Sequence, residues 1–143
     1  MKNYERIKGQ PLESLTSPIA QLLGIRVVEL GDGRAVLEME AGPQHANPMG
    51  TLHGGILCDV GDLAMGATCW STLEEGESFT TLELKVNYLK PVWNSVLRAT
   101  ARIKKAGRTT ALIECDVHDA KGSLVAHMTS TCLVLRGDMA KGR

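Results

Sequence analysis

Aromatic residues are the scarcest class in this sequence, which has one Phe, two Trp and two Tyr in 143 residues. With so few large rings, a core of ordinary density must be filled by aliphatic side chains and by the six methionines, whose flexible thioethers adapt to irregular gaps. We therefore expect an aliphatic, methionine-filled core.

An excess of charge of one sign is also lacking, because 16 Lys and Arg residues balance 16 Asp and Glu residues. No block of like charges occurs along the chain. Proteins that bind nucleic acid or anionic membranes generally concentrate positive charge on one face. The balance therefore argues against nucleic acid and membrane as the main partners.

Long hydrophobic runs are absent as well. The polar N-terminus, MKNYERIKGQPLESL, has no apolar stretch of the signal-peptide kind, and Asp59 and Asp62 interrupt the longest apolar segment. We expect neither a signal peptide nor a membrane span. We therefore expect a cytoplasmic location. The four cysteines form no C-x-x-C pair and have no metal-type spacing with histidine, which favours buried thiols in a reducing compartment and no metal site.

The length predicts one domain with a core that needs no disulfide. We expect a flexible segment at 1–13, the domain at 14–136 and a polar tail at 137–143. Within the domain, SPIAQLLG predicts a short helix with a serine cap, proline at its first position and Gly24 at its end.

Six segments have the alternating or β-branched patterns of strands. The turn signals Gly31-Asp32-Gly33 and Ala106-Gly107-Arg108 predict two hairpins. In the third segment, alternation predicts Leu84 and Val86 on one face and Thr81 on the other. The segments are 25–30, 34–40, 80–91, 96–105, 109–118 and 123–135.

The stretch HANPMGTLHGGILCDVGDLAMGATCW, residues 45–70, predicts the one long helix, entered through Gly54-Gly55. A helix start leaves free backbone N–H groups where partial positive charge collects, and these can polarise an oxygen. With two strands before this helix and four after it, the predicted fold class is α+β, a curved antiparallel sheet wrapped around one helix.

The predicted helix is apolar nearly all round, which indicates burial on two sides, against the sheet and against a second subunit. A carboxylate at such an interface is costly unless it is paired, hydrogen-bonded or chemically useful. Asp62 is expected there, whereas a structural or solvated role is expected for Asp59. At about 100° per residue, one stripe is Ile56, Val60, Leu63 and Ala67, and the other is Cys58, Met65 and Cys69.

The pattern Asn47-x-x-Gly50-x-x-His53-Gly54-Gly55, with Asp62 nine residues after the histidine, resembles the hotdog-fold acyl-CoA thioesterases. The similarity is to the PaaI-like branch, covers about residues 14–136 and includes the strand end NYLKP. It implies a hotdog fold and a homodimer whose sheets join edge to edge, commonly paired again into a tetramer. It also implies active sites at the dimer interface.

The resemblance also implies roles for single residues. The Gly55 backbone N–H polarises the thioester carbonyl, and Asp62 of the partner subunit acts as general base or as nucleophile. Asn47 and His53 orient the thioester and shape the loop. Thr81 occupies a position where the family often has Ser or Thr to place water.

For the coenzyme A part of the substrate, the resemblance implies a second set of contacts. Gly54 belongs to the binding turn, the pantetheine arm runs beside Tyr88, and the phosphates meet Lys90, Lys105 and Arg108. No separate cofactor or metal is implied. The acyl pocket is expected to be lined by the loop at 42–52, by the helix face near Cys58, Met65 and Trp70, and by strand residues from the partner subunit.

Structural explanations exist for the same residues. Asp62 could belong to a buried hydrogen-bond network, the Gly54-Gly55 pair could serve close packing, and Lys105 and Arg108 could form an ordinary solvated turn. Two other functions also stay open. One is a non-catalytic acyl-CoA-binding module, although residues 1–13 cannot supply the helix-turn-helix of such regulators. The other is an acyl-thioester hydratase or dehydratase, although the Gly-Gly pair after His53 is not typical of those enzymes.

Overall fold

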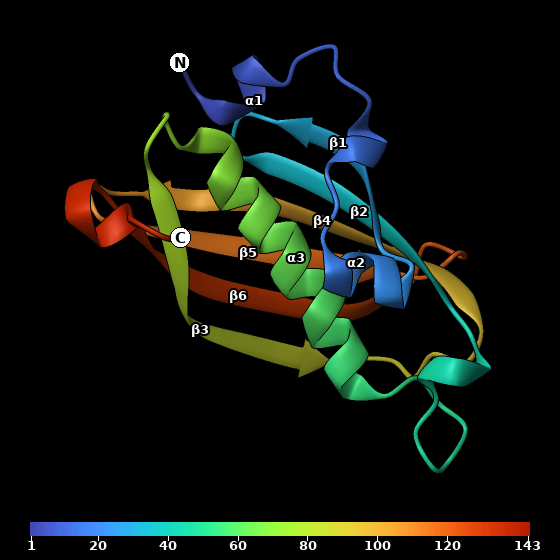
Figure 1. Ribbon diagram of the computed structural model, residues 1–143. Coiled ribbons are helices and arrows are strands. Elements are labelled where there is room, and N and C mark those ends of the chain that lie inside the picture. The colour runs from blue at the N-terminus through green and yellow to red at the C-terminus, as the bar shows by residue number, and fades with distance from the viewer.

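The computed structural model, which describes residues 1–143, is one curved six-stranded antiparallel sheet with the long helix α3 lying across one face (Figure 1). The strand order is β1-β2-β4-β5-β6-β3, so β1 and β3 are the edges. The predicted α+β class is confirmed. The main elements are α1 Asn3–Arg6, α2 Pro18–Leu23, β1 Arg26–Gly31, β2 Arg34–Ala41, α3 Gly54–Thr72, β3 Ser78–Tyr88, β4 Ser95–Ala106, β5 Thr110–His118 and β6 Leu124–Leu135.

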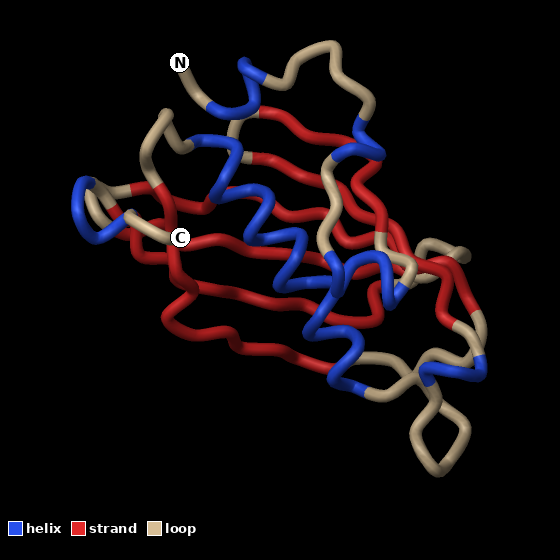
Figure 2. Tube along the Cα trace, viewed as in Figure 1, coloured by secondary structure: helices blue, strands red, loops and turns tan.

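Local signals in the sequence account for most element ends. The side chain of Ser17 accepts a hydrogen bond from the Ala20 N–H at 3.3 Å and caps α2, which ends at Gly24 with φ of 71°. Gly33, also at φ of 71°, makes the turn between β1 and β2. The short helix and both predicted hairpins are therefore confirmed, and Figure 2 shows the hairpin turns at the ends of the strands.

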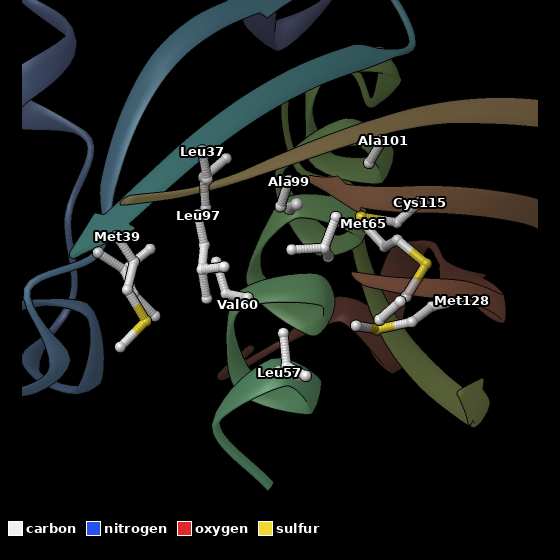
Figure 3. Close-up of a cluster of buried hydrophobic side chains, with 14 of the residues drawn as sticks. Leu37, Met39, Leu57, Val60, Met65, Leu97, Ala99, Ala101, Cys115 and Met128 are labelled. Atoms are coloured by element: carbon white, nitrogen blue, oxygen red, sulfur yellow. The ribbon is translucent and has the colours of Figure 1, made fainter. Parts of the chain in front are cut away.

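The core lies between α3 and the concave face of the sheet (Figure 3). Met39, Met65 and Met128 are fully buried there beside Val60 and Leu97, and no aromatic side chain is among the largest fully buried ones. Methionine and branched aliphatic side chains thus fill the space that rings occupy in other domains. The expected aliphatic core is confirmed.

The division of α3 into two apolar stripes is wrong for Met65 and Cys69. Both are buried against the sheet, where the sequence places them on the opposite side. Ile56, Leu63 and Ala67 are only partly buried, and Asp62 is exposed on the outward face of the helix. Both stripes are apolar, so periodicity alone cannot choose which one meets the sheet.

A β-bulge at Leu82 changes the register of β3 against β6. Thr81 pairs with Cys132 and Glu83 with Thr131, which leaves Leu82 unpaired and exposed. A bulge shifts the side-chain alternation by one residue. Thr81 therefore faces the helix side, where its Oγ1 lies 3.9 Å from the buried Cys132 Sγ, and the predicted opposite face is wrong.

The chain start packs on the C-terminal end of α3. The Asn3 N–H donates to the carbonyl of the C-cap residue Leu73 at 2.8 Å, and Asn3 Nδ2 is a second donor, at 3.1 Å, to the Trp70 carbonyl, which also accepts the Leu73 N–H. Lys2 pairs with Asp32 at 2.9 Å. The flexible segment expected at 1–13 thus contains an anchored part. None of the helices is long and apolar enough to cross a membrane.

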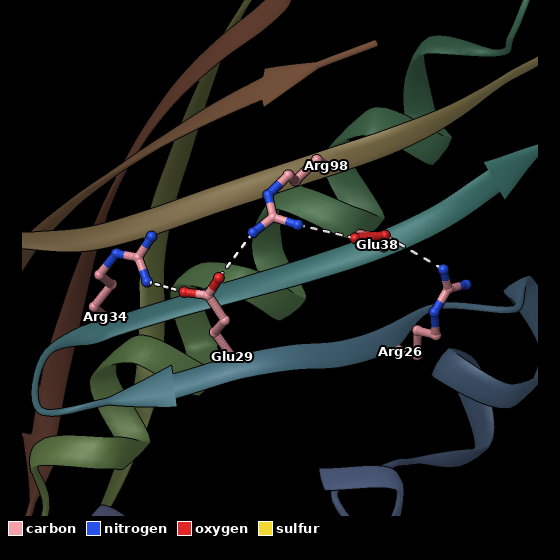
Figure 4. A network of polar contacts seen from close by, with 5 residues as sticks. All are labelled: Arg26, Glu29, Arg34, Glu38 and Arg98. Carbon is pink, nitrogen blue, oxygen red and sulfur yellow. Dashed lines mark hydrogen bonds and ion pairs between the residues drawn. The ribbon is translucent and has the colours of Figure 1, made fainter. Parts of the chain in front are cut away.

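The solvent face of β1, β2 and β4 carries a chain of alternating charges (Figure 4). Arg98 bridges Glu29 and Glu38 at 2.9 Å each, Arg26 reaches Glu38 at 3.3 Å, and Arg34 pairs with Glu29. The hydrogen bond from Arg34 lowers the pKa of Glu29. Each exposed ion pair contributes little to stability. The network shows that this face of the sheet is in contact with solvent, whereas the other face packs against α3.

Candidate active site

The start of α3 presents two free backbone donors. His53 is the N-cap, with extended φ and ψ of −61° and 129°, and the N–H groups of Gly54 and Gly55 find no acceptor within the chain. They line a cavity of about 550 Å³ together with Tyr88 and Lys90. The 19-residue helix behind them adds partial positive charge, so this cavity suits a polarised carbonyl oxygen.

The phenol of Tyr88 holds the peptide that carries the Gly55 N–H. Tyr88 Oη donates to the Gly54 carbonyl at 3.0 Å and lies 3.3 Å from Cys58 Sγ. The contact with Cys58, followed by burial, raises the pKa of Tyr88 to about 12, so the phenol keeps its proton. A Cβ on Gly54 would lie 3.0 Å from the Tyr88 ring, and one on Gly55 would lie 3.1 Å from the His53 ring. Glycine thus allows the close approach of the Tyr88 ring at position 54, whereas at position 55 an added Cβ would only displace the exposed His53 ring.

Asn47 shapes the loop that leads into α3. Its Oδ1 accepts the N–H groups of Met49 and Thr51 at 3.0 and 3.2 Å, and its Nδ2 donates to Thr51 Oγ1 at 2.7 Å. The His53 N–H donates to the His45 carbonyl at 2.9 Å, while the His53 ring is exposed. The geometry supports loop shaping by Asn47 and His53, whereas orientation of a thioester by either residue stays a prediction.

Asp62 and Thr81 lie together at a second cavity, of about 370 Å³, on the outward side of α3. Asp62 is exposed, yet partial desolvation of its carboxyl, and then the negative charge of Asp59, raise its pKa above the usual aspartate range. A carboxylate with a raised pKa beside an apolar cavity has the properties of a general base.

The residues predicted to act in catalysis therefore lie at two separate cavities of one chain, which we call the candidate half-sites. Gly54, Gly55 and Tyr88 line the cavity at the start of α3, while Asp62 and Thr81 line the other cavity. Seven residues separate Gly55 from Asp62, or about 10 Å along the helix axis. The cavity at the start of α3 contains no carboxylate, and the cavity beside Asp62 contains no free N–H from the helix start.

The basic residues predicted to bind phosphate do not converge in one chain. Lys90 lies at the Gly55 cavity and pairs with Asp119 at 2.7 Å, which lowers the pKa of Asp119. Lys105 and Arg108 lie at the hairpin of β4 and β5, near the opposite end of α3. The helix between the two ends is about 28 Å long. No group of three His, Cys, Asp or Glu side chains is placed to hold a metal ion.

The residues expected to line the acyl pocket do not all meet at the cavity beside Asp62 in one chain. Trp70 does line the cavity beside Asp62, but Met65 is buried beneath the helix and the loop at 42–52 does not reach this cavity. Its other wall comes from the segment at 15–30, with Phe79 from β3. The sequence predicted the short helix in this segment, SPIAQLLG, but not that the segment forms a wall of the cavity beside Asp62.

The expectation of buried thiols holds for three of the four cysteines, and Cys58 is half-buried. Two histidines outside the predicted site, His127 and His45, each have a hydrogen-bonding partner in the chain. His127 Nδ1 lies 2.6 Å from Asp116 Oδ1, and His45 Nδ1 accepts the Gly42 N–H at 3.1 Å. Neither histidine lines either of the two cavities.

Comparison with known proteins agrees with this geometry. A sequence model described as the thioesterase superfamily matches residues 49–126. Human acyl-coenzyme A thioesterase 13 is 27% identical over 129 residues, which cover 87% of this chain and 80% of that protein. The structure of PA5202 from Pseudomonas aeruginosa is 33% identical, with a TM-score of 0.80 and coverage of 86% of this chain and 98% of that one.

The thioesterase HI1161 from Haemophilus influenzae is 25% identical, with a TM-score of 0.82 over 87% of this chain and 88% of that one. Its likeness, together with that of PA5202, confirms the hotdog fold, a curved sheet around one long helix. The matched residues 49–126 include the His53-Gly54-Gly55 entry of α3 and Asp62. The chain belongs to the thioesterase superfamily.

Proposed function

We propose that this enzyme hydrolyses acyl-CoA thioesters to a free acid and CoA, at sites formed between two subunits. The observation that carries the proposal is the Gly55 N–H, which has no acceptor in the chain and lies at the start of a long helix inside a cavity. Family membership supports thioester hydrolysis, and the similarity to an acyl-coenzyme A thioesterase supports a CoA carrier.

In the proposed reaction, the Gly55 N–H donates to the thioester oxygen and stabilises the negative charge that develops there. The Asp62 carboxylate takes a proton from water as the water oxygen attacks the carbonyl carbon, and Thr81 positions that water. The carbon–sulfur bond then breaks, and the protonated Asp62 returns the proton to the leaving CoA thiolate. Direct attack by Asp62 would instead give an acyl-enzyme anhydride, which water then opens.

A second subunit joins the two half-sites. In one chain, Gly55 and Asp62 line different cavities, so we propose that each site takes Gly55 from one subunit and Asp62 from the other. The long strand β3 has an unpaired edge and exposes Leu82, which suits edge-to-edge pairing of two sheets. A further pairing into a tetramer and a cytoplasmic location belong to the same proposal.

The CoA part would enter along the Gly55 cavity. Tyr88 and Lys90 line it, so the pantetheine arm would lie beside Tyr88 and the Lys90 ammonium would exchange Asp119 for a phosphate. Lys105 and Arg108 would contact the phosphates from the second subunit, because within one chain they lie at the far end of α3.

The test is thiol release from a panel of acetyl-, hexanoyl-, octanoyl-, phenylacetyl- and hydroxybenzoyl-CoA. We expect turnover of at least one of these and no hydration of an enoyl-CoA. If the folded protein binds these thioesters without releasing thiol, it is a binding module. Hydration of enoyl-CoA without hydrolysis would instead make it a hydratase.

The pH dependence of the reaction should follow Asp62. The carboxylate is the active form, so the rate is lost as pH falls through its pKa, which lies above the usual aspartate range. Because the charge of Asp59 helps to raise that pKa, Asp59→Asn should move the acid limb of kcat/KM to lower pH. The plateau at higher pH should change little. A pH–rate profile of both proteins measures this. An acid limb at the same pH in both would show that the charge of Asp59 does not affect the pKa of the group that limits the rate.

A further inference from the structure

Two glycines interrupt the interior of α3, where glycine is less favourable than any residue except proline. Gly61 has a packing reason, because a Cβ there would lie 2.1 Å from Met128 Sδ in the core. Gly66 has no such reason. The nearest atom to a Cβ at this position would be Phe79 Cζ at 3.4 Å, an ordinary contact. Gly66 thus keeps open a space that the chain itself does not fill.

That space belongs to the cavity beside Asp62. Asp62, Gly66 and Trp70 follow one another at intervals of four residues, so they form one stripe on the outward face of α3. The stripe is about 12 Å long from Asp62 to Trp70, with Gly66 in the middle. Phe79 lies opposite Gly66, and α2 lies beside this part of the helix (Figure 1).

The residues that line the cavity determine which class of ligand it can bind. Ten of its 15 lining residues are hydrophobic, and the other side chains that reach it are hydroxyls and one carboxylate, Asp62. It offers no cation to a negatively charged ligand. A mostly apolar cavity of this size with one carboxylate of raised pKa is a typical small-molecule site.

We propose that this cavity binds an uncharged, apolar acyl group, with the thioester at Asp62, the chain passing over Gly66 and its end against Trp70. Gly66 is then the residue that sets the acceptable acyl length. The inference rests on the proposed thioesterase function and assigns the substrate class of the same site.

Adding one methyl group at the middle of the stripe tests the inference. Gly66→Ala should lower kcat/KM for octanoyl-CoA about 10-fold or more and leave acetyl-CoA almost unchanged, since one misplaced methylene in an apolar pocket costs about 10–200-fold. The melting temperature should rise by about 2–4 °C, because alanine favours the helix and its Cβ would make only an ordinary contact with Phe79. An unchanged ratio of octanoyl to acetyl rates would overturn the inference, as would loss of self-association in this variant.

Gly61→Ala is the matched control on the same helix. Its Cβ would collide with Met128 in the core, so the melting temperature should fall while the octanoyl to acetyl ratio stays that of the wild type. If the octanoyl to acetyl ratio changed with the melting temperature in both variants, the result would contradict an acyl pocket at Gly66.

The absence of a cation in the lining gives a second readout. Suberyl-CoA, in which a carboxylate replaces the terminal methyl group of the octanoyl chain, should show a kcat/KM at least about 10-fold below that of octanoyl-CoA, because the cavity leaves that charge unpaired. Equal rates for the two substrates would contradict an apolar end wall.

Binding can be separated from catalysis by fluorescence. The chain has two tryptophans, so Trp93→Phe leaves Trp70 as the only one, and adding Asp62→Asn suppresses turnover. Octanoyl-CoA should change Trp70 emission and acetyl-CoA should not. A Trp70 response with no hydrolysis by wild type would reject the thioesterase proposal and keep the acyl pocket. Hydrolysis without a Trp70 response would reject the pocket alone.

Discussion

Asp62→Asn should lower kcat for the best acyl-CoA by about 10²–10⁴-fold, the range that a positioned general base contributes. Asparagine keeps the size of the side chain and removes its ability to take a proton. KM should change little, because the carboxylate acts on water rather than on the CoA part. The fold should survive, since Asp62 has no hydrogen-bond or ion-pair partner in the chain and its raised pKa means that folding disfavours the charge.

Asp59→Asn is the matched control for this variant, since it makes the same change three residues earlier on α3. It should retain most of the rate above the acid limb. Steady-state kinetics and thermal melts of the two proteins in parallel decide the matter. An equal loss of kcat in both variants would indicate that Asp62 has a structural role rather than a catalytic one. A slow Asp62→Asn protein with a lower melting temperature would indicate the same.

Gly55→Pro should lower kcat by about 10²–10³-fold, the typical loss when one donor of an oxyanion site is removed. Proline removes the N–H, and the first turn of a helix tolerates it because that N–H has no partner within the helix. Far-ultraviolet circular dichroism and single-turnover kinetics with the best acyl-CoA measure fold and chemistry separately.

Gly55→Ala is the control at the same position, because it adds a Cβ and keeps the N–H. The added atom meets only the exposed His53 ring at 3.1 Å, which can rotate away. Alanine should therefore cost much less activity than proline. Equal losses would show that space at residue 55, rather than its N–H, is what the reaction needs.

The fold is largely predictable from this sequence because local signals agree with one another. Glycine turns separate clearly patterned strands, and the apolar run after Gly54-Gly55 leaves room for only one long helix. The choice of the buried stripe was not predictable, because Met65 and Leu63 are both apolar and only tertiary packing distinguishes them.

The candidate site was predictable in its residue types and less so in its geometry. The spacing from His53 to Asp62 resembles a known pattern, and these two residues line the two cavities, while their catalytic roles stay predictions. The bulge at Leu82 left no sign in the alternation of β3, yet it turns Thr81 toward the Asp62 cavity. The cover from residues 15–30 is a long-range contact, which neither periodicity nor spacing encodes.

The central claim is that each active site combines Gly55 of one subunit with Asp62 of another, and mixed dimers test it most directly. Asp62→Asn and Gly55→Pro chains with different affinity tags would be co-expressed and the mixed species purified. In such a dimer, one site receives the intact Gly55 of the first chain and the intact Asp62 of the second, while the other site carries both defects.

Thiol release by the mixed dimer should return to about half of the wild-type rate per dimer, since one of two symmetric sites is intact. Each variant alone should remain almost inactive. Mixed dimers as inactive as the two parents would contradict the account, because they would place Gly55 and Asp62 in the same site from the same chain.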